Sequence, residues 1–174
     1  MDTFVEQIVA KQKDGKDYAI IAGSILAALI IVILIFPYIF VFGILAILLL
    51  FGLGYGLWWL LSSLNIEYEY SVTNGDIDID QIIARRKRKR VVSVAGDKIE
   101  SLEPFSADEY AVRKFDRRVI AAPSANASDL WCFSYRSKKN GHTLVVFQPE
   151  QRVLEALKSG LSALVLLETN KKSR

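Results

Sequence analysis

The sequence predicts an α+β membrane protein: an N-terminal transmembrane helical hairpin, then a small cytoplasmic β-barrel capped by a C-terminal helix. No charged side chain occurs from Tyr18 to Leu64. Beyond this segment, short stretches alternate apolar and polar residues, which is typical of half-buried strands. After Pro149, apolar residues recur at helical spacing. The chain therefore divides into an amphipathic N-terminal segment (1–17), the hairpin (18–64) and the domain (65–174).

The uncharged segment is 47 residues long, whereas a bilayer core about 30 Å thick needs roughly 20 apolar residues in a helix. We expect two spans, 18–36 and 39–61, with the break at Pro37-Tyr38, because proline lacks an N–H and disfavours helix in the residue before it. A single Pro-kinked helix would far exceed the bilayer. A signal peptide is disfavoured because the flank mixes acids and bases and no small-residue cleavage site precedes the second span.

The distribution of Lys and Arg predicts the orientation. Lys11, Lys13 and Lys16 precede the first span, and the run Arg85–Arg90 follows the second, whereas the loop at Pro37 has neither residue type. Lys and Arg collect on the cytoplasmic side of membrane proteins. We therefore expect a multi-pass protein of the inner membrane with both termini in the cytoplasm, where the single cysteine would stay reduced.

Small residues in the spans are candidates for helix packing. Gly52 and Gly56 form a GxxxG motif, and Gly23 and Ala27 form a second small-xxx-small pair. Such pairs let helices approach closely in lipid. We favour packing within the hairpin, with homodimerisation or contact with a foreign helix as alternatives. Because no ionisable residue lies inside the spans, the sequence argues against a transporter or channel acting alone.

The segment before the hairpin, Met1–Asp14, is predicted to be a short amphipathic helix. Thr3 and Glu6 have capping-box spacing. One face would hold the apolar residues Phe4, Val5, Ile8 and Val9. Such a helix can lie among lipid headgroups or dock on the domain, and the sequence does not separate these alternatives.

The domain begins with a predicted β-hairpin. Ile66–Val72 alternates apolar and polar residues, and Asn74-Gly75 follows, a pair that tolerates the positive φ of a two-residue turn. This turn would pair Val72 with Ile77 and Tyr70 with Ile79, so that apolar residues share one face. The other face would gather the carboxylates of Glu67, Glu69, Asp76, Asp78 and Asp80. Like charges that face one another are destabilising, so this face needs basic neighbours.

The remaining elements continue in short segments. We predict a third strand at Arg88–Val94, a short helical or irregular piece at Lys98–Glu103, a strand at Val119–Ala122, and a hairpin of Leu130–Tyr135 and Thr143–Phe147. In this hairpin Trp131, Phe133 and Tyr135 are expected to face the core rather than to stack on bases. One helix would follow Pro149, with an apolar stripe of Val153, Leu154, Leu157, Leu161, Leu164 and Val165.

This order of segments resembles the bacterial pleckstrin-homology-like (PH-like) domain. The residues that carry the resemblance are Tyr70–Ile79, Val91–Val94, Lys98–Leu102 and Phe147–Glu150. Two spans ahead of such a domain also resemble a group of small bacterial membrane proteins of unknown function. The resemblance implies a barrel that serves as a binding or assembly module and has no catalytic residues.

A run of six basic residues is the main candidate for a binding site. It consists of Arg85, Arg86, Lys87, Arg88, Lys89 and Arg90. Basic clusters close to a membrane span attract anionic headgroups, and guanidinium groups suit phosphate. A protein partner is a second interpretation, and neutralisation of the carboxylates on the neighbouring strands is a third. The domain 65–174 has 19 Lys and Arg against 15 Asp and Glu, a net charge of +4 that is too mild to demand nucleic acid as a partner.

The three aspartates Asp76, Asp78 and Asp80 do not form a calcium loop. Such a loop needs glycine at its sixth position and glutamate at its twelfth, and these positions hold Gln81 and Lys87. A solvent-facing strand is the better interpretation, and no metal is expected.

No residue pattern predicts a reaction. Cys132 and His142 are the only residues of their types, and the predicted hairpin puts Cys132 several residues from the turn that His142 adjoins. A nucleophilic pair must lie within hydrogen-bond reach, so we do not expect catalysis, and no cofactor motif is present.

The sequence therefore predicts a non-enzymatic, membrane-anchored binding or assembly module that contacts anionic lipid headgroups or a protein partner. The alternative is an accessory subunit of a membrane enzyme or transporter complex. The end of the last helix, Leu161–Leu167, could pack on the barrel or dip into the membrane.

Overall fold

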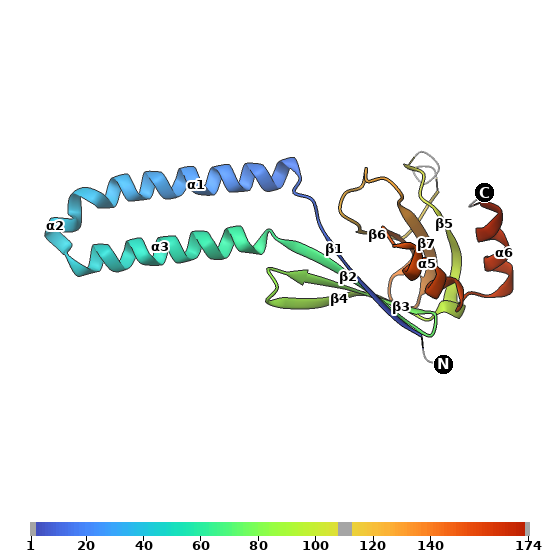
Figure 1. Cartoon of the computed structure of the whole chain (residues 1–174). Coiled ribbons are helices and arrows are strands. Elements are labelled where there is room, and N and C mark those ends of the chain that lie inside the picture. Colours follow the sequence, from blue (N-terminus) through green and yellow to red (C-terminus); the bar gives the residue numbers. More distant parts are fainter. Residues whose placement is uncertain (1–2, 108–112, 173–174) are drawn as a thin grey trace. The chain divides into compact units, whose positions relative to one another are not determined.

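The structure, a computed structural model, describes residues 3–107 and 113–172 (Figure 1). The chain forms two compact units. Residues 12–66 form the helical unit, and residues 1–11 together with 67–174 form the β unit. The β unit is thus built from two stretches of chain that are separated by the helices.

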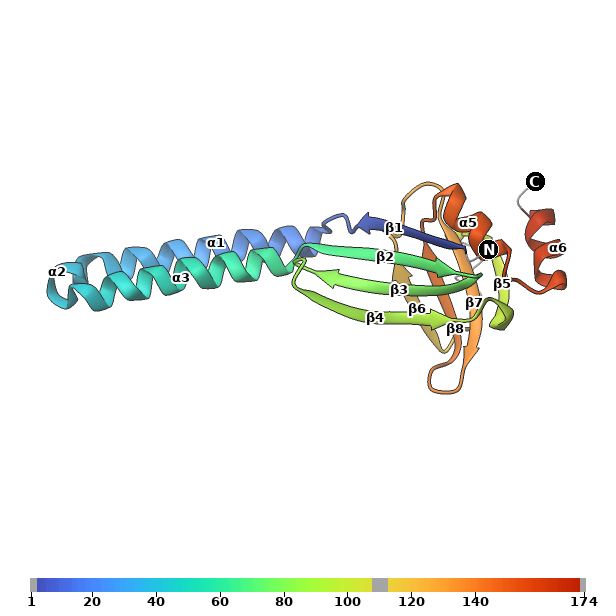
Figure 2. The same cartoon turned by 60° about the horizontal axis from the view of Figure 1, so that its bottom comes forward.

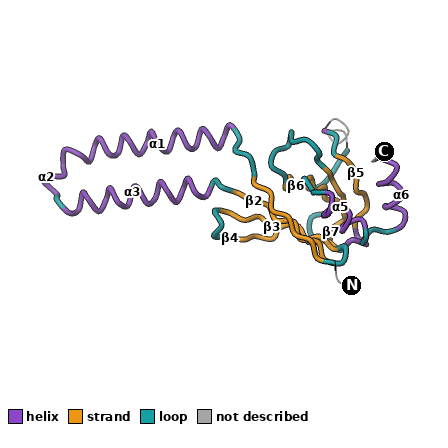
Figure 3. The backbone as a smooth tube through the Cα atoms, viewed as in Figure 1, coloured by secondary structure: helices purple, strands orange, loops and turns teal. Residues whose placement is uncertain are grey.

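The helical unit is a hairpin of two long apolar helices (Figure 3). Its elements are α1 (Gly15–Ile35), the 3₁₀ turn η1 (Phe36–Tyr38), α2 (Ile39–Phe42) and α3 (Ile44–Ser63). Both Gly15–Phe42 and Ile44–Ser63 are long and apolar enough to cross a membrane. Length and composition of this kind are weak evidence for a membrane location, and they agree with the predicted spans in number.

The reversal between the helices differs from the prediction. It extends from η1 to Gly43 instead of lying at Pro37-Tyr38, and the second long helix begins at Ile44 instead of Ile39. Pro37 stands in the first turn of η1, where its missing N–H costs no hydrogen bond. The chain turns at Gly43, whose φ of 50° is in the left-handed region that glycine adopts without strain.

The β unit contains two four-stranded sheets. Sheet A has the order β1-β2-β3-β4 and sheet B the order β5-β7-β8-β6 (Figure 2). Sheet A comprises β1 (Phe4–Ala10), β2 (Ile66–Thr73), β3 (Asp76–Ile83) and β4 (Lys87–Val94). Sheet B comprises β5 (Ile99–Pro104), β6 (Arg117–Ala121), β7 (Trp131–Ser137) and β8 (Gly141–Phe147).

The prediction of a closed barrel is not confirmed: among the described residues the structure has two separate sheets. The short turn η2 (Gly96–Lys98) intervenes between β4 and β5, and β5 pairs with β7 instead of β4. The strand β5 replaces the helical or irregular piece predicted at Lys98–Glu103. In addition, β6 pairs in parallel with β8, which a local pattern does not predict.

The N-terminal segment also differs from the prediction, because residues 4–10 form a strand instead of a helix. β1 pairs antiparallel with β2, from Phe4 opposite Thr73 to Ala10 opposite Glu67. Its alternation places Val5, Gln7 and Val9 on the face that continues into Tyr68, Tyr70 and Val72.

The inner faces of the two sheets form the core of the β unit. Tyr70 packs edge-on against Phe147 with ring centroids 5.7 Å apart. Phe133 also packs edge-on against Phe147, with ring centroids 5.4 Å apart. Phe133 and Tyr135 are buried and Trp131 is half-buried, so the prediction of core-facing aromatics holds. A second cluster packs around Cys132 and comprises Ala122, Leu130, Leu144 and Val146.

Two helices follow β8 where one was predicted. These are α5 (Gln151–Lys158), which buries Val153, Leu154 and Leu157, and α6 (Ala163–Lys172). The break occurs around Gly160, whose backbone lies against that of Gly75. α6 packs on β5, while Leu164 and Leu167 are exposed. The end of the predicted helix therefore packs on a sheet through one face only.

Candidate functional site

The candidate site is the end of sheet A where the chain leaves for α1 and returns from α3. β1 ends at Ala10 opposite Glu67, and the antiparallel order places the β3–β4 turn at the same end. We call this the connection end of sheet A. The helices are thus an insertion between two neighbouring strands, and the predicted basic run lies in the turn and strand at this end.

The β3–β4 turn has an unusual backbone. Ala84 and Arg85 have φ values of 54° and 55°, and the N–H of Arg86 donates to the carbonyl of Ile83 at 3.0 Å. The β2–β3 turn adopts positive φ with Asn74 and Gly75, residue types that tolerate it. Alanine and arginine do so only with strain.

Arg90 binds two carboxylates on β3. Its Nε donates to Asp80 at 2.6 Å and its Nη1 donates to Asp78 at 2.8 Å. A third bond runs from Nη2 to Asp80 at 3.2 Å. The hydrogen bond to Asp80 is the main cause that raises the pKa of Arg90 above its usual value. This fork geometry is the strongest form of ion pair that arginine makes.

Two further arginines neutralise the same face. Arg88 forms an ion pair with the buried carboxylate of Glu69, and its Nε lies 3.1 Å from Asp80. Arg85 contacts Glu67 at 3.1 Å. The carboxylate face is thus supplied with the basic neighbours that the sequence analysis required. Arg85, Arg88 and Arg90 of the basic run thus form ion pairs with carboxylates of β2 and β3.

The two lysines of the run lie on the other face of β4. Lys87 is opposite Ile83 and Lys89 is opposite Gln81, whose side chains share the face of Ile79. Both lysines are exposed, and neither has an ion-pair partner among the residues that the structure describes. Arg85, Arg88 and Arg90 therefore pair with the carboxylate face, whereas Lys87 and Lys89 lie on the opposite face of β4 and Arg86 lies in the β3–β4 turn.

A β-bulge produces this division. Ile79 is opposite Val92, yet the next residue, Asp80, is opposite Arg90, so that Val91 is the extra residue on β4. Without the bulge, strict alternation from Val92 would point Arg90 into the core-side face. A bulge shifts the register by one residue and re-aims the side chains beyond it.

The three aspartates of β3 have partners within the sheet. Asp78 and Asp80 bind Arg90, and Asp76 accepts a hydrogen bond from the N–H of Gly96 at 3.0 Å. They therefore act as structural acceptors along one strand, in agreement with the interpretation as a strand.

The small residues of the spans lie outside the contact between α1 and α3. A Cβ built on Gly23, Gly52 or Gly56 would meet no atom within 4 Å, and Ala27 is exposed. On α3 the less exposed apolar positions are Ala46, Leu50, Leu53, Leu57 and Leu61. Packing within the hairpin thus relies on a leucine face, and a contact of the glycine face with another helix stays a prediction.

Cys132 and His142 are apart, as the sequence analysis expected. Cys132 is opposite Val146 and His142 is opposite Arg136, which separates them by four positions or about 13 Å along the strand. The Cys132 thiol donates to the carbonyl of Glu103 at 3.5 Å. The Nε2 atom of His142 lies 3.3 Å from a carboxylate oxygen of Glu100.

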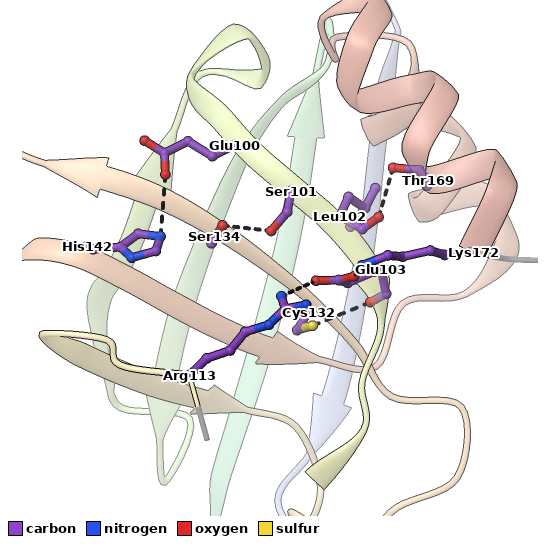
Figure 4. Close-up of polar contacts among 10 residues, drawn as sticks. All are labelled: Glu100, Ser101, Leu102, Glu103, Arg113, Cys132, Ser134, His142, Thr169 and Lys172. Atoms are coloured by element: carbon purple, nitrogen blue, oxygen red, sulfur yellow. Dashed lines mark hydrogen bonds and ion pairs between the residues drawn. The ribbon is translucent and has the colours of Figure 1, made fainter. Parts of the chain in front are cut away.

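One polar cluster was missed by the sequence analysis. The buried carboxylate of Glu103 on β5 forms ion pairs with Lys172 of α6 and with Arg113 at 2.9 Å (Figure 4). Beside it, the Thr169 hydroxyl donates to the carbonyl of Leu102 at 2.8 Å. These bonds fasten α6 along the outer edge of sheet B, so the cluster has a structural role. No local sequence signal connects residues about 70 positions apart.

Comparison with known proteins identifies the family of the chain. No curated protein and no solved structure matches the chain. Residues 1–166 match the family described as "Bacterial PH-like domain (DUF6106)". This match includes β1 and both long helices as well as the two sheets. The chain therefore belongs to this family of bacterial PH-like domains, whose function is unknown.

Proposed function

We propose that this protein is a non-enzymatic binding or assembly module, anchored in the inner membrane by the α1–α3 hairpin with both termini in the cytoplasm. The observation that carries the proposal is the insertion of two apolar helices between β1 and β2, at the connection end of sheet A. An anchor inserted there holds the PH-like domain by two covalent connections instead of one.

The charges at the two ends of the helical unit support this orientation. Lys13 and Lys16 are exposed at the start of α1, whereas residues 36–43 contain no Lys or Arg. Tyr18, Trp58 and Trp59 are exposed close to the charged end, as residues of an interfacial aromatic belt would be.

A binding role is supported by the polar side chains of the domain, because those that could take part in chemistry are buried or paired within the sheets. Cys132 is buried, His142 pairs with Glu100, and the aspartates of β3 bind Arg90 or the backbone. These groups stabilise the sheets, so we assign the function to surfaces of the domain. The ligand would be anionic lipid or a protein partner that meets the basic run.

Sidedness of thiol labelling tests the proposed placement. Because native Cys132 is buried, a cysteine introduced by Lys139→Cys in the β7–β8 turn or by Tyr38→Cys between the helices would be the reactive one. With a membrane-impermeant maleimide, we expect Lys139→Cys to react only in inverted membrane vesicles and Tyr38→Cys only in intact spheroplasts. The opposite pattern, or release of the protein by carbonate, would refute the proposal.

The alternative is an accessory subunit of a membrane enzyme or transporter complex. It is favoured by the exposed glycine face of α3, because Gly52 and Gly56 are open to a helix from outside the hairpin. A Gly52→Cys variant, oxidised or cross-linked in native membranes, distinguishes the two interpretations. A dimer of this chain favours self-association, and an adduct with a different protein favours the accessory role.

A further inference from the structure

We propose that Lys87 and Lys89 bind the phosphate groups of anionic phospholipids at the surface of the membrane that anchors the protein. The proposal rests on the proposed function for the anchor and its orientation. It goes further because it names the ligand and divides the basic run: Lys87 and Lys89 would contact lipid, while Arg85, Arg88 and Arg90 stabilise sheet A.

The first argument is the use of charge on each face of β4. Arg85, Arg88 and Arg90 are engaged by carboxylates of Glu67, Glu69, Asp78 and Asp80. A guanidinium that moved to a lipid phosphate would leave a carboxylate without its partner, and for the buried Glu69 and Asp80 that is unfavourable. Lys87 and Lys89 would lose no ion pair among the described residues, so their charge is available.

The second argument is the position of the lysines in the sheet. Lys87 is the first residue of β4 and lies opposite Ile83, directly after the turn at the connection end. The chain passes from α3 to β2 through Leu64 and Asn65 alone. Three peptide units reach about 11 Å when fully extended. The anchor is therefore joined to sheet A by a short connection, at the end of the sheet where Lys87 lies.

The third argument is the chemistry of the side chain. A lysine ammonium is a compact charge on a flexible stem with three rotatable donors, so it can follow phosphates that change position in a fluid layer. Two lysines two residues apart on one face of a strand project in the same direction, about 7 Å from each other. They can thus engage neighbouring headgroups at the same time.

The chain provides an internal control in the β7–β8 turn. Lys138 and Lys139 are a second exposed lysine pair. This turn follows Tyr135, which is opposite Ile99, and Ile99 comes directly after η2. Gly96 of η2 lies against Gly75 at the other end of sheet A. The control pair therefore lies on the side of sheet A that is opposite to the connection end.

Amine labelling of the full chain in nanodiscs tests the proposal. The rate of acetylation at each lysine is measured by mass spectrometry in phosphatidylcholine and in a mixture with phosphatidylglycerol. A lysine amine that contacts anionic headgroups is less accessible to the acetylating reagent, so we expect Lys87 and Lys89 to react at least about threefold more slowly in the anionic discs. High salt should restore the rate, and Lys138 and Lys139 should not change.

Equal rates for Lys87 and Lys89 in the two lipids would overturn the proposal, and so would equal slowing of the control pair. Failure of the proposed function is separately visible, because a chain that does not span the bilayer fails the thiol-labelling test. A second arm compares Lys87→Gln/Lys89→Gln with Lys138→Gln/Lys139→Gln. Added phosphatidylglycerol should raise the Tm of the wild type and of the control variant in detergent, and should leave the first variant unchanged.

Discussion

Tyr70 connects the two sheets through a single phenol group. Its hydroxyl donates to the carbonyl of Ala121 on β6 and accepts a hydrogen bond from the N–H of Gln148 at 3.4 Å. The ring is fully buried against Phe147. Burial is the largest of the causes that raise the pKa of Tyr70. The neutral phenol is therefore part of the folded structure.

The pKa shift predicts a loss of stability in alkali. The unfolded chain has a tyrosine pKa of about 10, and the folded value is higher. The contribution of Tyr70 to the free energy of unfolding is thus complete below about pH 10 and is lost as the pH rises further. We expect Tyr70→Phe to cost about 1–3 kcal/mol at neutral pH, because the Ala121 carbonyl loses its donor. Thermal unfolding measured from neutral pH to above pH 10 should then show a smaller fall in Tm for Tyr70→Phe than for the wild type. If the Tm of both proteins fell in parallel with pH, the prediction would be contradicted.

At the same scale, the basic run illustrates what a sequence can and cannot predict. Its proximity to the carboxylates of β2 and β3 follows from strand order and opposite charge, and this prediction is confirmed for Arg85, Arg88 and Arg90. The separation of Lys87 and Lys89 from these arginines depends on the bulge at Val91. A bulge is set by packing on both sides of a strand, so alternation within one strand does not predict it.

At the scale of elements, three glycines determine how separate segments meet. The β2–β3 turn, η2 and the link between α5 and α6 approach one another at Gly75, Gly96 and Gly160. A Cβ on Gly160 would lie 2.6 Å from the Cα of Gly75, and one on Gly96 would lie 2.5 Å from the carbonyl oxygen of Gly75. The contacts are between backbones, which cannot move aside as a flexible side chain can.

Substitution at this junction should therefore be costly. We expect Gly160→Ala to destabilise the β unit by about 3 kcal/mol through overpacking, which corresponds to roughly 10 °C in Tm. Gly15→Ala is the matched control, since a Cβ at Gly15 meets nothing within 4 Å. Thermal melting in detergent checks both variants. If Gly160→Ala had the same Tm as the wild type, the close approach of Gly160 to Gly75 would not constrain the fold.

The elements that the sequence predicts correctly are those with a local signal. The strands around Asn74-Gly75 and the β7–β8 hairpin have alternation and turn residues, and they form as expected. β1 was misassigned because its apolar residues also fit a helical face, and only pairing with β2, across the inserted helices, selects the strand. Likewise, the division into α5 and α6 depends on the contact of Gly160 with Gly75, which no local pattern contains.

At the scale of the whole molecule, β1 makes the N-terminal segment part of the domain behind the helices. The side chain of Gln7 donates from Nε2 to the carbonyl of Gln148 at 3.0 Å and accepts from the N–H of Glu150 at 2.7 Å. The buried side chain of Gln7 thus joins β1 to the segment that leads into α5. A fragment that starts at residue 65 would lack this strand and expose the edge of β2.

This dependence predicts how a soluble form of the domain must be made. The β1–β2 register places Lys11 opposite Ile66 as its next pair, so residues 1–11 can be joined to residues 66–174 through a two-residue Asn-Gly turn. We expect this fusion to be monomeric and to unfold cooperatively. The fragment 66–174 alone should associate through the free edge of β2 and melt at a lower temperature. Size-exclusion chromatography and thermal denaturation compare the two. A monomeric fragment with the Tm of the fusion would mean that β1 is dispensable, and the family resemblance in residues 1–11 would then need another explanation.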